Sequence, residues 1–141
     1  MTAANCAFCA IVTGEAEAEA DVVLREGGFT AFLDRRPVFK GHVLLVPDTH
    51  VVTLPDLPAE LRDGFLAAGQ RLARAMVDGL EAQGSFVAIN NTVSQSVPHL
   101  HVHVVPRTKG DGLRGFFWPR TKYADAADSA RYAERLRAAL E

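Results

Sequence analysis

The sequence predicts an α+β fold with an antiparallel sheet, one long central helix, a short N-terminal helix and a C-terminal helix. Three observations predict it. Segments rich in β-branched and aromatic residues are grouped along the chain and do not alternate strictly with helical segments. A pair of glycines separates two of these segments, as in a hairpin turn. One long stretch carries the three- and four-residue apolar spacing of an amphipathic helix.

The first half of the chain predicts a short helix and three strands. A helical turn is expected around residues Cys6 to Val12. Two β-rich segments follow, Val22–Arg25 and Phe29–Leu33, and the glycines of Glu26-Gly27-Gly28 between them predict a hairpin turn. The compact apolar run His42–Val46 ends at a proline and is consistent with a buried strand.

The second half begins with the longest helical pattern, which opens after Pro58 and which we expect Gly84 to end. Two further strands are predicted, Ser85–Ile89 and Leu100–Val105, joined by a polar loop. A final helix is expected over Asp125–Leu140. The apolar stripe of the long helix consists of Leu61, Phe65, Ala68, Leu72, Met76 and Leu80.

The composition places the chain among ordinary globular proteins. It has 141 residues, of which 48% are hydrophobic and 23% charged, enough for one domain with its own core. The 15 basic and 17 acidic residues leave a formal net charge of −2, which argues against a dedicated nucleic-acid binder. The apolar runs are far shorter than the ~20 residues of a membrane helix, and the N-terminus lacks signal-peptide features. We therefore expect a cytoplasmic protein that binds neither membrane nor nucleic acid.

The two cysteines, Cys6 and Cys9, form a single C-x-x-C pair. A structural disulfide is not expected in a cytosolic chain of this size. Metal binding, redox chemistry and two incidental small residues remain as interpretations. A zinc site would need two more ligands from elsewhere, and the five histidines are the strong candidates.

Three of those histidines, His99, His101 and His103, alternate with apolar residues. Side chains of a strand point to alternate faces, so the three histidines share one face and the intervening apolar residues share the core face. Three exposed histidines on an edge strand would be the alternative, but their strict register favours a function. Either a metal held by imidazoles or acid–base and nucleophilic chemistry by imidazole itself could use such a face.

The loop before this strand favours the second chemistry. It is rich in neutral hydrogen-bonding side chains, and no carboxylate cluster for a hydrolytic metal lies near it in sequence. Such groups suit phosphate oxygens and developing oxyanions. The residues are Asn90, Asn91, Ser94, Gln95 and Ser96.

The segment His99-Leu100-His101-Val102-His103-Val104-Val105 resembles the His-x-His-x-His-x-x signature of the histidine triad (HIT) superfamily, where x is hydrophobic. The resemblance covers about residues 5–107, and residues 108–141 then form a C-terminal extension of a single domain spanning 1–141. The other matching blocks are Cys6-x-x-Cys9 with Ile11, Phe32-Leu33-Asp34, Gly41 to Pro47, Gln95-Ser96-Val97-Pro98 and Pro106-Arg107.

The resemblance implies a homodimeric enzyme that hydrolyses or transfers the nucleotidyl group of an adenosine conjugate, either a phosphoramidate or a dinucleoside polyphosphate. His101 would be the nucleophile that attacks the α-phosphorus and forms a nucleotidyl-histidine intermediate. His103 would hold the α-phosphate oxygens or relay a proton. Gln95 and Ser96 would contact the phosphate and leaving group, and Asn91 is a less secure match in the same loop.

The resemblance also implies a nucleotide pocket and a structural zinc. Asp34 would bind the ribose hydroxyls, beside a base pocket, expected to take a purine, lined by Phe8, Ile11 and Phe32. The zinc would be held in a closed tetrahedral site. His42 would support the site, or be a buried histidine satisfied by hydrogen bonds. The matching zinc ligands are Cys6, Cys9, His50 and His99.

The segment after the triad, Asp111 to Arg120, combines glycines, aromatic residues and cations. It could bind substrate, with Arg107, Lys109 or Arg114 on outer phosphates and Trp118 on a base. We favour the other interpretation, in which the segment covers a surface or packs in a dimer. Two other functions stay open: a nucleotide-binding regulatory or scaffold protein with incidental hydrolysis, and a metalloenzyme that uses all three histidines.

Overall fold

The computed structural model describes residues 5–15, 20–113 and 120–141. Its chain forms two compact units, Met1–Lys109 and Gly110–Glu141. The first unit holds α1 (Ala7–Val12), β1 (Val22–Glu26), β2 (Phe29–Leu33), β3 (Val43–Pro47), the 3₁₀ turns Leu54–Asp56 and Ala59–Leu61, α2 (Arg62–Leu80), β4 (Gly84–Ala88) and β5 (Val102–Arg107). The second holds α3 (Ala126–Leu140).

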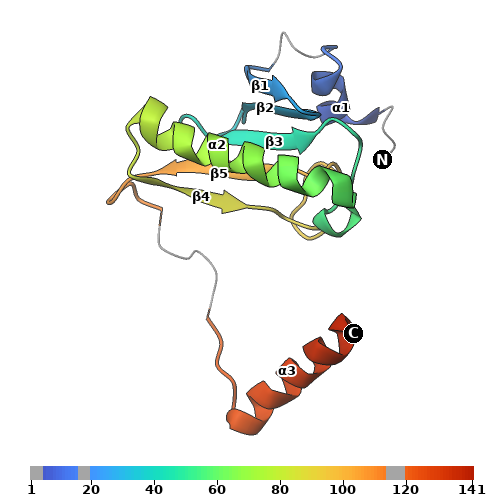
Figure 1. The fold of residues 1–141 in the computed structure, drawn as a ribbon. Coiled ribbons are helices and arrows are strands. Elements are labelled where there is room, and N and C mark those ends of the chain that lie inside the picture. The colour runs from blue at the N-terminus through green and yellow to red at the C-terminus, as the bar shows by residue number, and fades with distance from the viewer. Residues whose placement is uncertain (1–4, 16–19, 114–119) are drawn as a thin grey trace. The chain divides into compact units, whose positions relative to one another are not determined.

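The five strands form one sheet in the order β1-β2-β3-β5-β4, and every neighbouring pair is antiparallel. The long helix α2 lies across one face of this sheet (Figure 1). It buries Phe65, Ala68, Leu72 and Met76, four members of the predicted apolar stripe. The α+β class and the antiparallel sheet are therefore confirmed.

The register of the central strands determines which side chains lie on the second face of the sheet, the one that carries α1 and not α2. Phe32 of β2 lies opposite Leu44 of β3, and Leu44 lies opposite His103 of β5. Directly opposed residues share a face of a sheet. The sheet thus places His103 on the face that carries the smaller apolar cluster, which includes Cys6, Phe8, Phe32, Leu44 and Val46.

The end of α2 differs from the sequence prediction. Glu81, in the left-handed conformation at φ 59°, follows the last helical residue. The Ala82 N–H then bonds back to the Met76 carbonyl at 3.1 Å, and Ala82 itself is buried in the core. The helix is therefore ended by a left-handed residue other than glycine. Gly84, which we expected to end the helix, is the first residue of β4.

Helix α3, in the second unit, is amphipathic and buries no side chain. Its N-terminus is capped by Asp125, whose carboxylate accepts a hydrogen bond from the Asp128 N–H at 2.8 Å. No helix among the residues that the structure describes is long and apolar enough to cross a membrane.

Candidate functional site

The histidine-bearing segment runs into β5, but only its last part belongs to the sheet. The strand begins at Val102, so His99 and His101 precede it. The His101 and His103 rings still lie on one side, with centroids 5.0 Å apart. The intervening residues Leu100, Val102 and Val104 are buried in the core beneath α2, as the alternation predicts.

The orientation of His101 follows from one hydrogen bond. Its Nδ1 lies 2.7 Å from the carbonyl oxygen of His99. Because a carbonyl oxygen only accepts, Nδ1 carries the hydrogen, and the lone pair of neutral imidazole is left on Nε2. The ring is buried against the edge of Phe8, with centroids 5.1 Å apart.

A second chain of hydrogen bonds orients His103. The Val38 N–H donates to His42 Nδ1 at 3.1 Å, so neutral His42 carries its hydrogen on Nε2. That Nε2 lies 3.0 Å from His103 Nδ1, which must then accept. His103 is left with its hydrogen on Nε2, as a donor.

Burial keeps this pair of imidazoles neutral. Burial, followed by the charges of His101 and His42, lowers the pKa of His103 to about 4. Burial also lowers the pKa of His42, although the Asp34 carboxylate opposes this. The nearest approach is 3.7 Å, between Asp34 Oδ2 and His42 Nε2.

The ligand atoms of Asp34, His42 and His103 lie within 4.8 Å of one another, close enough to hold a metal ion. The hydrogen bond from Val38 argues against this. A metal on His42 Nε2 would move the imidazole hydrogen to Nδ1, where it would face the Val38 N–H, one donor against another. We therefore interpret these residues as a hydrogen-bonded chain.

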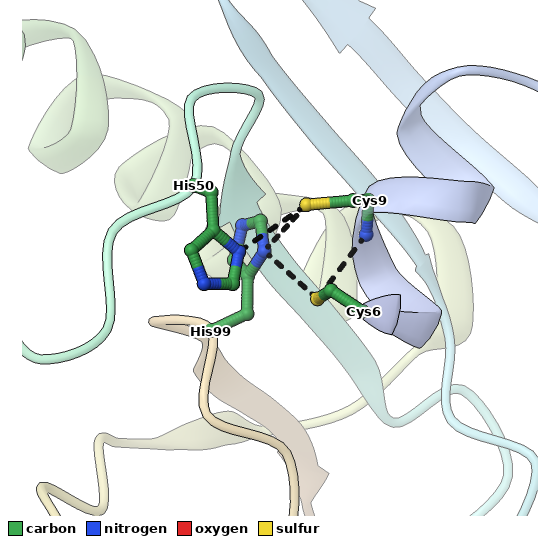
Figure 2. A group of neighbouring side chains, drawn as sticks. All are labelled: Cys6, Cys9, His50 and His99. Atoms are coloured by element: carbon green, nitrogen blue, oxygen red, sulfur yellow. Dashed lines mark hydrogen bonds between the residues drawn. The ribbon is translucent and has the colours of Figure 1, made fainter. Parts of the chain in front are cut away.

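A different cluster gathers the four predicted zinc ligands, as Figure 2 shows. Cys6 and Cys9 come from the start of α1, His50 from the loop after β3, and His99 from the segment before β5. Their ligand atoms lie within 4.8 Å of one another. The nearest sulfur–nitrogen distances are 3.3 Å from Cys9 Sγ to His50 Nδ1, and 3.4 and 3.5 Å from Cys6 and Cys9 Sγ to His99 Nδ1.

This cluster fits a zinc ion. The His99 Nε2–H donates to the Pro47 carbonyl at 2.8 Å, which leaves the Nδ1 lone pair directed at the two sulfurs. Tetrahedral zinc with Zn–S ~2.3 Å and Zn–N ~2.05 Å sets sulfur and nitrogen about 3.6 Å apart. Both cysteines are free thiols. Burial and the neighbouring Cys6 raise the pKa of Cys9 to about 11, so binding of a cation there would displace a proton.

Seven of the predicted site residues line a cavity of about 320 Å³ between α1 and the sheet. The predicted residues found in its wall are Phe8, Ile11, Phe32, Asp34, Ser96, His101 and His103. Phe8 and Phe32 meet edge to face there, with centroids 5.2 Å apart. An apolar wall, a carboxylate and two imidazoles thus surround one space, a combination suited to a ligand with an aromatic base, hydroxyls and a phosphate.

Two predicted loop residues lie outside this wall. Gln95 donates from Nε2 to the Val52 carbonyl at 2.6 Å, and Asn91 Oδ1 accepts from the Leu54 N–H at 2.8 Å. Both side chains thus tie their loop to the segment after β3. Arg107 and Lys109 are likewise not among the described wall residues. Arg114 and Trp118 fall outside the residues that the structure describes.

Sequence reasoning missed several wall residues. Arg35 follows Asp34 directly, and its charge next to a ribose-binding candidate was an available signal. Small residues of α1 and its surroundings give no such signal, because alanine is common anywhere. The missed residues are Ala7, Ala10, Ala20, Leu33, Arg35, Leu44 and Val97.

Comparison with known proteins identifies the family. The model of the HIT domain matches residues 15–110. The chain belongs to the histidine triad family. An uncharacterized HIT-like protein of Mycobacterium tuberculosis, Rv1262c, is 43% identical over 110 residues, which is 77% of this chain and 75% of that protein. A zinc-bound histidine triad protein of Mycobacterium smegmatis, of solved structure, is 40% identical with a TM-score of 0.73, and the match covers 99% of this chain and 100% of that one.

Two other relatives carry the names of enzymes. The adenosine 5′-monophosphoramidase HNT1 of Saccharomyces cerevisiae is 33% identical over 82% of this chain and 71% of its own length. The asymmetrical bis(5′-nucleosyl)-tetraphosphatase of Schizosaccharomyces pombe is 38% identical over 57% of this chain and 46% of its own length. Both names describe hydrolases that act on nucleotides.

Proposed function

We propose that this protein hydrolyses, or transfers, the nucleotidyl group of a purine nucleotide conjugate through a covalent intermediate on His101. Membership of a family with nucleotide hydrolases supports hydrolase activity on nucleotides. The observation that carries the mechanism is the bond from His101 Nδ1–H to the His99 carbonyl, because it leaves Nε2 as the nitrogen of this cavity-wall residue that is available for attack.

In the first step, the Nε2 lone pair of His101 attacks the α-phosphorus. A nitrogen–phosphorus bond forms, the bond from phosphorus to the leaving group breaks, and the leaving group departs with the electron pair and takes up a proton from solvent. Water then attacks the same phosphorus and gives up a proton to solvent, the nitrogen–phosphorus bond breaks, and the lone pair returns to Nε2. One difficult displacement thus becomes two easier ones.

His103 binds a phosphate oxygen through its Nε2–H. The alternative role, in which His103 delivers a proton, is disfavoured because a histidine with a pKa of about 4 carries no extra proton at neutral pH. Ser96, whose side chain belongs to the same wall, adds a neutral donor on the phosphate side. Gln95 and Asn91 keep the predicted role near the leaving group only if substrate draws them away from the backbone groups that they now bind.

The nucleoside occupies the other end of the cavity. The Asp34 carboxylate accepts from the ribose hydroxyls, a charge-assisted arrangement. Phe8, Ile11 and Phe32 supply the apolar surface for a purine base. The cavity fits a nucleoside monophosphate group in either a phosphoramidate or a dinucleoside polyphosphate.

Zinc, held by Cys6, Cys9, His50 and His99, would serve as a structural ion that joins α1 to the segment carrying His101. No reaction step needs it. A buried nitrogen, His50 Nε2, has no hydrogen-bond partner among the described residues, although Nδ1 of the same ring faces the Cys9 sulfur. The solved zinc-bound relative from Mycobacterium smegmatis supports this assignment.

We further propose a cytoplasmic homodimer. Strand β4 lies at one edge of the sheet, next to α2. The two elements expose Val87 and Leu66, at 51% and 68%, around an apolar hollow of about 430 Å³. A second copy is a suitable cover, because it would remove both the open strand edge and the apolar surface from water.

The test of the enzymatic proposal combines a substrate panel with adduct trapping. Purified protein is offered adenosine 5′-phosphoramidate and diadenosine tetraphosphate, quenched in alkali, where phosphohistidine-type bonds persist, and analysed by peptide mass spectrometry. We expect an adenylyl group on His101 with at least one substrate. The His101→Asn variant should fold normally, form no adduct and lose at least ~10³-fold in turnover. Turnover retained by that variant would contradict the proposal.

A further inference from the structure

Helix α1 contributes residues to both the candidate metal cluster and the candidate nucleotide cavity. Its start supplies Cys6 and Cys9 to the metal cluster, and Figure 2 shows these side chains directed at His50 and His99. The helix also supplies Phe8 and Ile11 to the wall of the nucleotide cavity. A single helix of six residues, Ala7–Val12, therefore links the two candidate binding sites.

A helix of this length has little stability of its own, because isolated helices shorter than about 12 residues are marginal in water. Its position depends on the contacts that hold it. Phe8 packs into the smaller apolar cluster. At the other end, the Arg25 guanidinium of β1 donates to the carbonyls of Ile11 and Val12 at 3.1 and 2.9 Å, which satisfies helix-end acceptors.

The contacts at the cysteine end are weak without a cation. They consist of thiol–imidazole approaches of 3.3 to 3.5 Å and a bond from the Cys9 N–H to Cys6 Sγ at 3.4 Å. Thiols are poor hydrogen-bond donors and acceptors. Coordination by a metal replaces these contacts with bonds worth far more free energy, and so holds α1 against the rest of the site.

We propose that metal binding at Cys6, Cys9, His50 and His99 and nucleotide binding in the cavity are positively coupled through α1. The metal fixes the helix, and the fixed helix presents Phe8 and Ile11 to the base. A nucleotide that packs against these side chains in turn fixes the helix and raises the affinity for the metal. This inference rests on the proposed function, because it assumes that the cavity binds a nucleotide.

Coupling between two binding equilibria is reciprocal, which makes the inference quantitative. The dissociation constant of AMP is measured by calorimetry on zinc-loaded and on chelator-stripped protein. The zinc affinity is measured separately, by competition with a fluorescent chelator, with and without saturating AMP. We expect each ligand to tighten the other by the same factor, about 5-fold or more.

Results that contradict the coupling can be distinguished from results that contradict the proposed function. AMP affinities within twofold of each other in the two states would overturn the coupling and leave the proposed function standing. Absence of AMP binding in both states would overturn the nucleotide-binding proposal and the coupling with it. Absence of zinc binding to the wild-type protein would overturn the zinc assignment and the coupling, and would leave the proposed hydrolase activity standing.

The Arg25→Met variant tests whether the coupling between the two sites runs through α1. It removes the hydrogen bonds at the far end of α1 and leaves every metal ligand in place. We expect AMP binding to weaken more in the stripped protein than in the zinc-loaded protein, so the coupling factor rises. The matched control is Arg74→Met, which removes an exposed arginine of α2 and should leave the factor unchanged. Equal factors in wild type and Arg25→Met would contradict a route through α1.

Hydrogen exchange tests whether zinc holds α1 in place, without any activity measurement. Removal of zinc should speed amide exchange in residues 7–12, while the amides of β2 and β3 stay protected. AMP should restore part of the protection. A uniform loss across the sheet would mean that the metal supports the whole unit, and no change in 7–12 would mean that it does not hold the helix. Either outcome would overturn the proposal.

Discussion

At the scale of single residues, backbone groups assign the imidazole hydrogens. The His99 and Pro47 carbonyls accept from His101 Nδ1 and His99 Nε2, and the Val38 N–H donates to His42. Each bond selects one tautomer. His101 is left with its lone pair on Nε2, His99 with an Nδ1 lone pair directed at the two cysteine sulfurs, and His103 with a donor at Nε2.

His42 should act as a positioning residue. The His42→Leu variant removes the only donor that the described residues supply to His103 Nδ1. We expect kcat to fall about 10- to 100-fold with a smaller change in KM, by analogy with loss of a group that orients a ligand residue. Imidazole ¹⁵N spectra should show His103 changing from one tautomer to a mixture. A single unchanged tautomer in the variant would contradict this role.

Histidine burial also predicts how stability depends on pH. The pKa of His103 falls from 6.5 in the unfolded chain to about 4 in the folded protein. Between these values the unfolded state binds more protons, so stability is complete above pH 6.5 and is lost as the pH falls towards 4. Urea denaturation between pH 7.5 and 4 should show this loss. The His103→Gln variant should show a shallower dependence, and an identical slope would contradict the assignment.

At the scale of elements, α2 and α1 hold the site in different ways. Helix α2 is long, and its apolar face is buried in the larger core cluster. It fixes the sheet and hence the position of His103. Helix α1 is short and is held by contacts at its two ends. The structure therefore joins a strand fixed within the sheet to a pocket wall that depends on its attachments.

The packing of α2 against the core can be tested by substitution. The Leu72→Ala variant deletes a buried side chain and should lower the free energy of unfolding by about 2–5 kcal/mol. The matched control is Val77→Ala, on an exposed position of the same helix, which should change it by no more than ~0.5 kcal/mol. Denaturant titration of both variants provides the measurement, and equal effects would contradict the assigned packing.

At the scale of the whole molecule, β1 and β4 are the two edge strands of the sheet in the part of the chain that the structure describes. The β4 edge adjoins the apolar surface that includes Leu66 and Val87. A chain that stays monomeric would leave this surface in water, which is uncommon for a patch flanked by an open strand edge.

Introduction of a negative charge at that surface tests the proposed homodimer. The Val87→Glu variant should shift sedimentation from dimer to monomer at micromolar concentration, because a carboxylate cannot be buried unpaired. Val23→Glu, on the exposed face of the opposite edge strand β1, is the matched control and should leave the dimer intact. A wild-type protein that sediments as a monomer would refute the assembly.

Local pattern in the sequence determined much of this protein. The period of two put His101 and His103 on one side and Leu100, Val102 and Val104 on the other, and the apolar stripe predicted α2. The end of α2 was predicted wrongly, because Glu81 takes the left-handed conformation that a glycine usually supplies, and the next residue, Ala82, is buried in the core.

Only the tertiary structure decided which atoms of those residues are free to act. Val38 orients His42, His42 orients His103 across 61 positions of the chain, and Asn91 and Gln95 bond to a loop far from them in sequence. Sequence patterns determine which face a side chain takes, because that follows from the local backbone. The position of its hydrogen follows from distant donors and acceptors, which meet it only when the chain has folded.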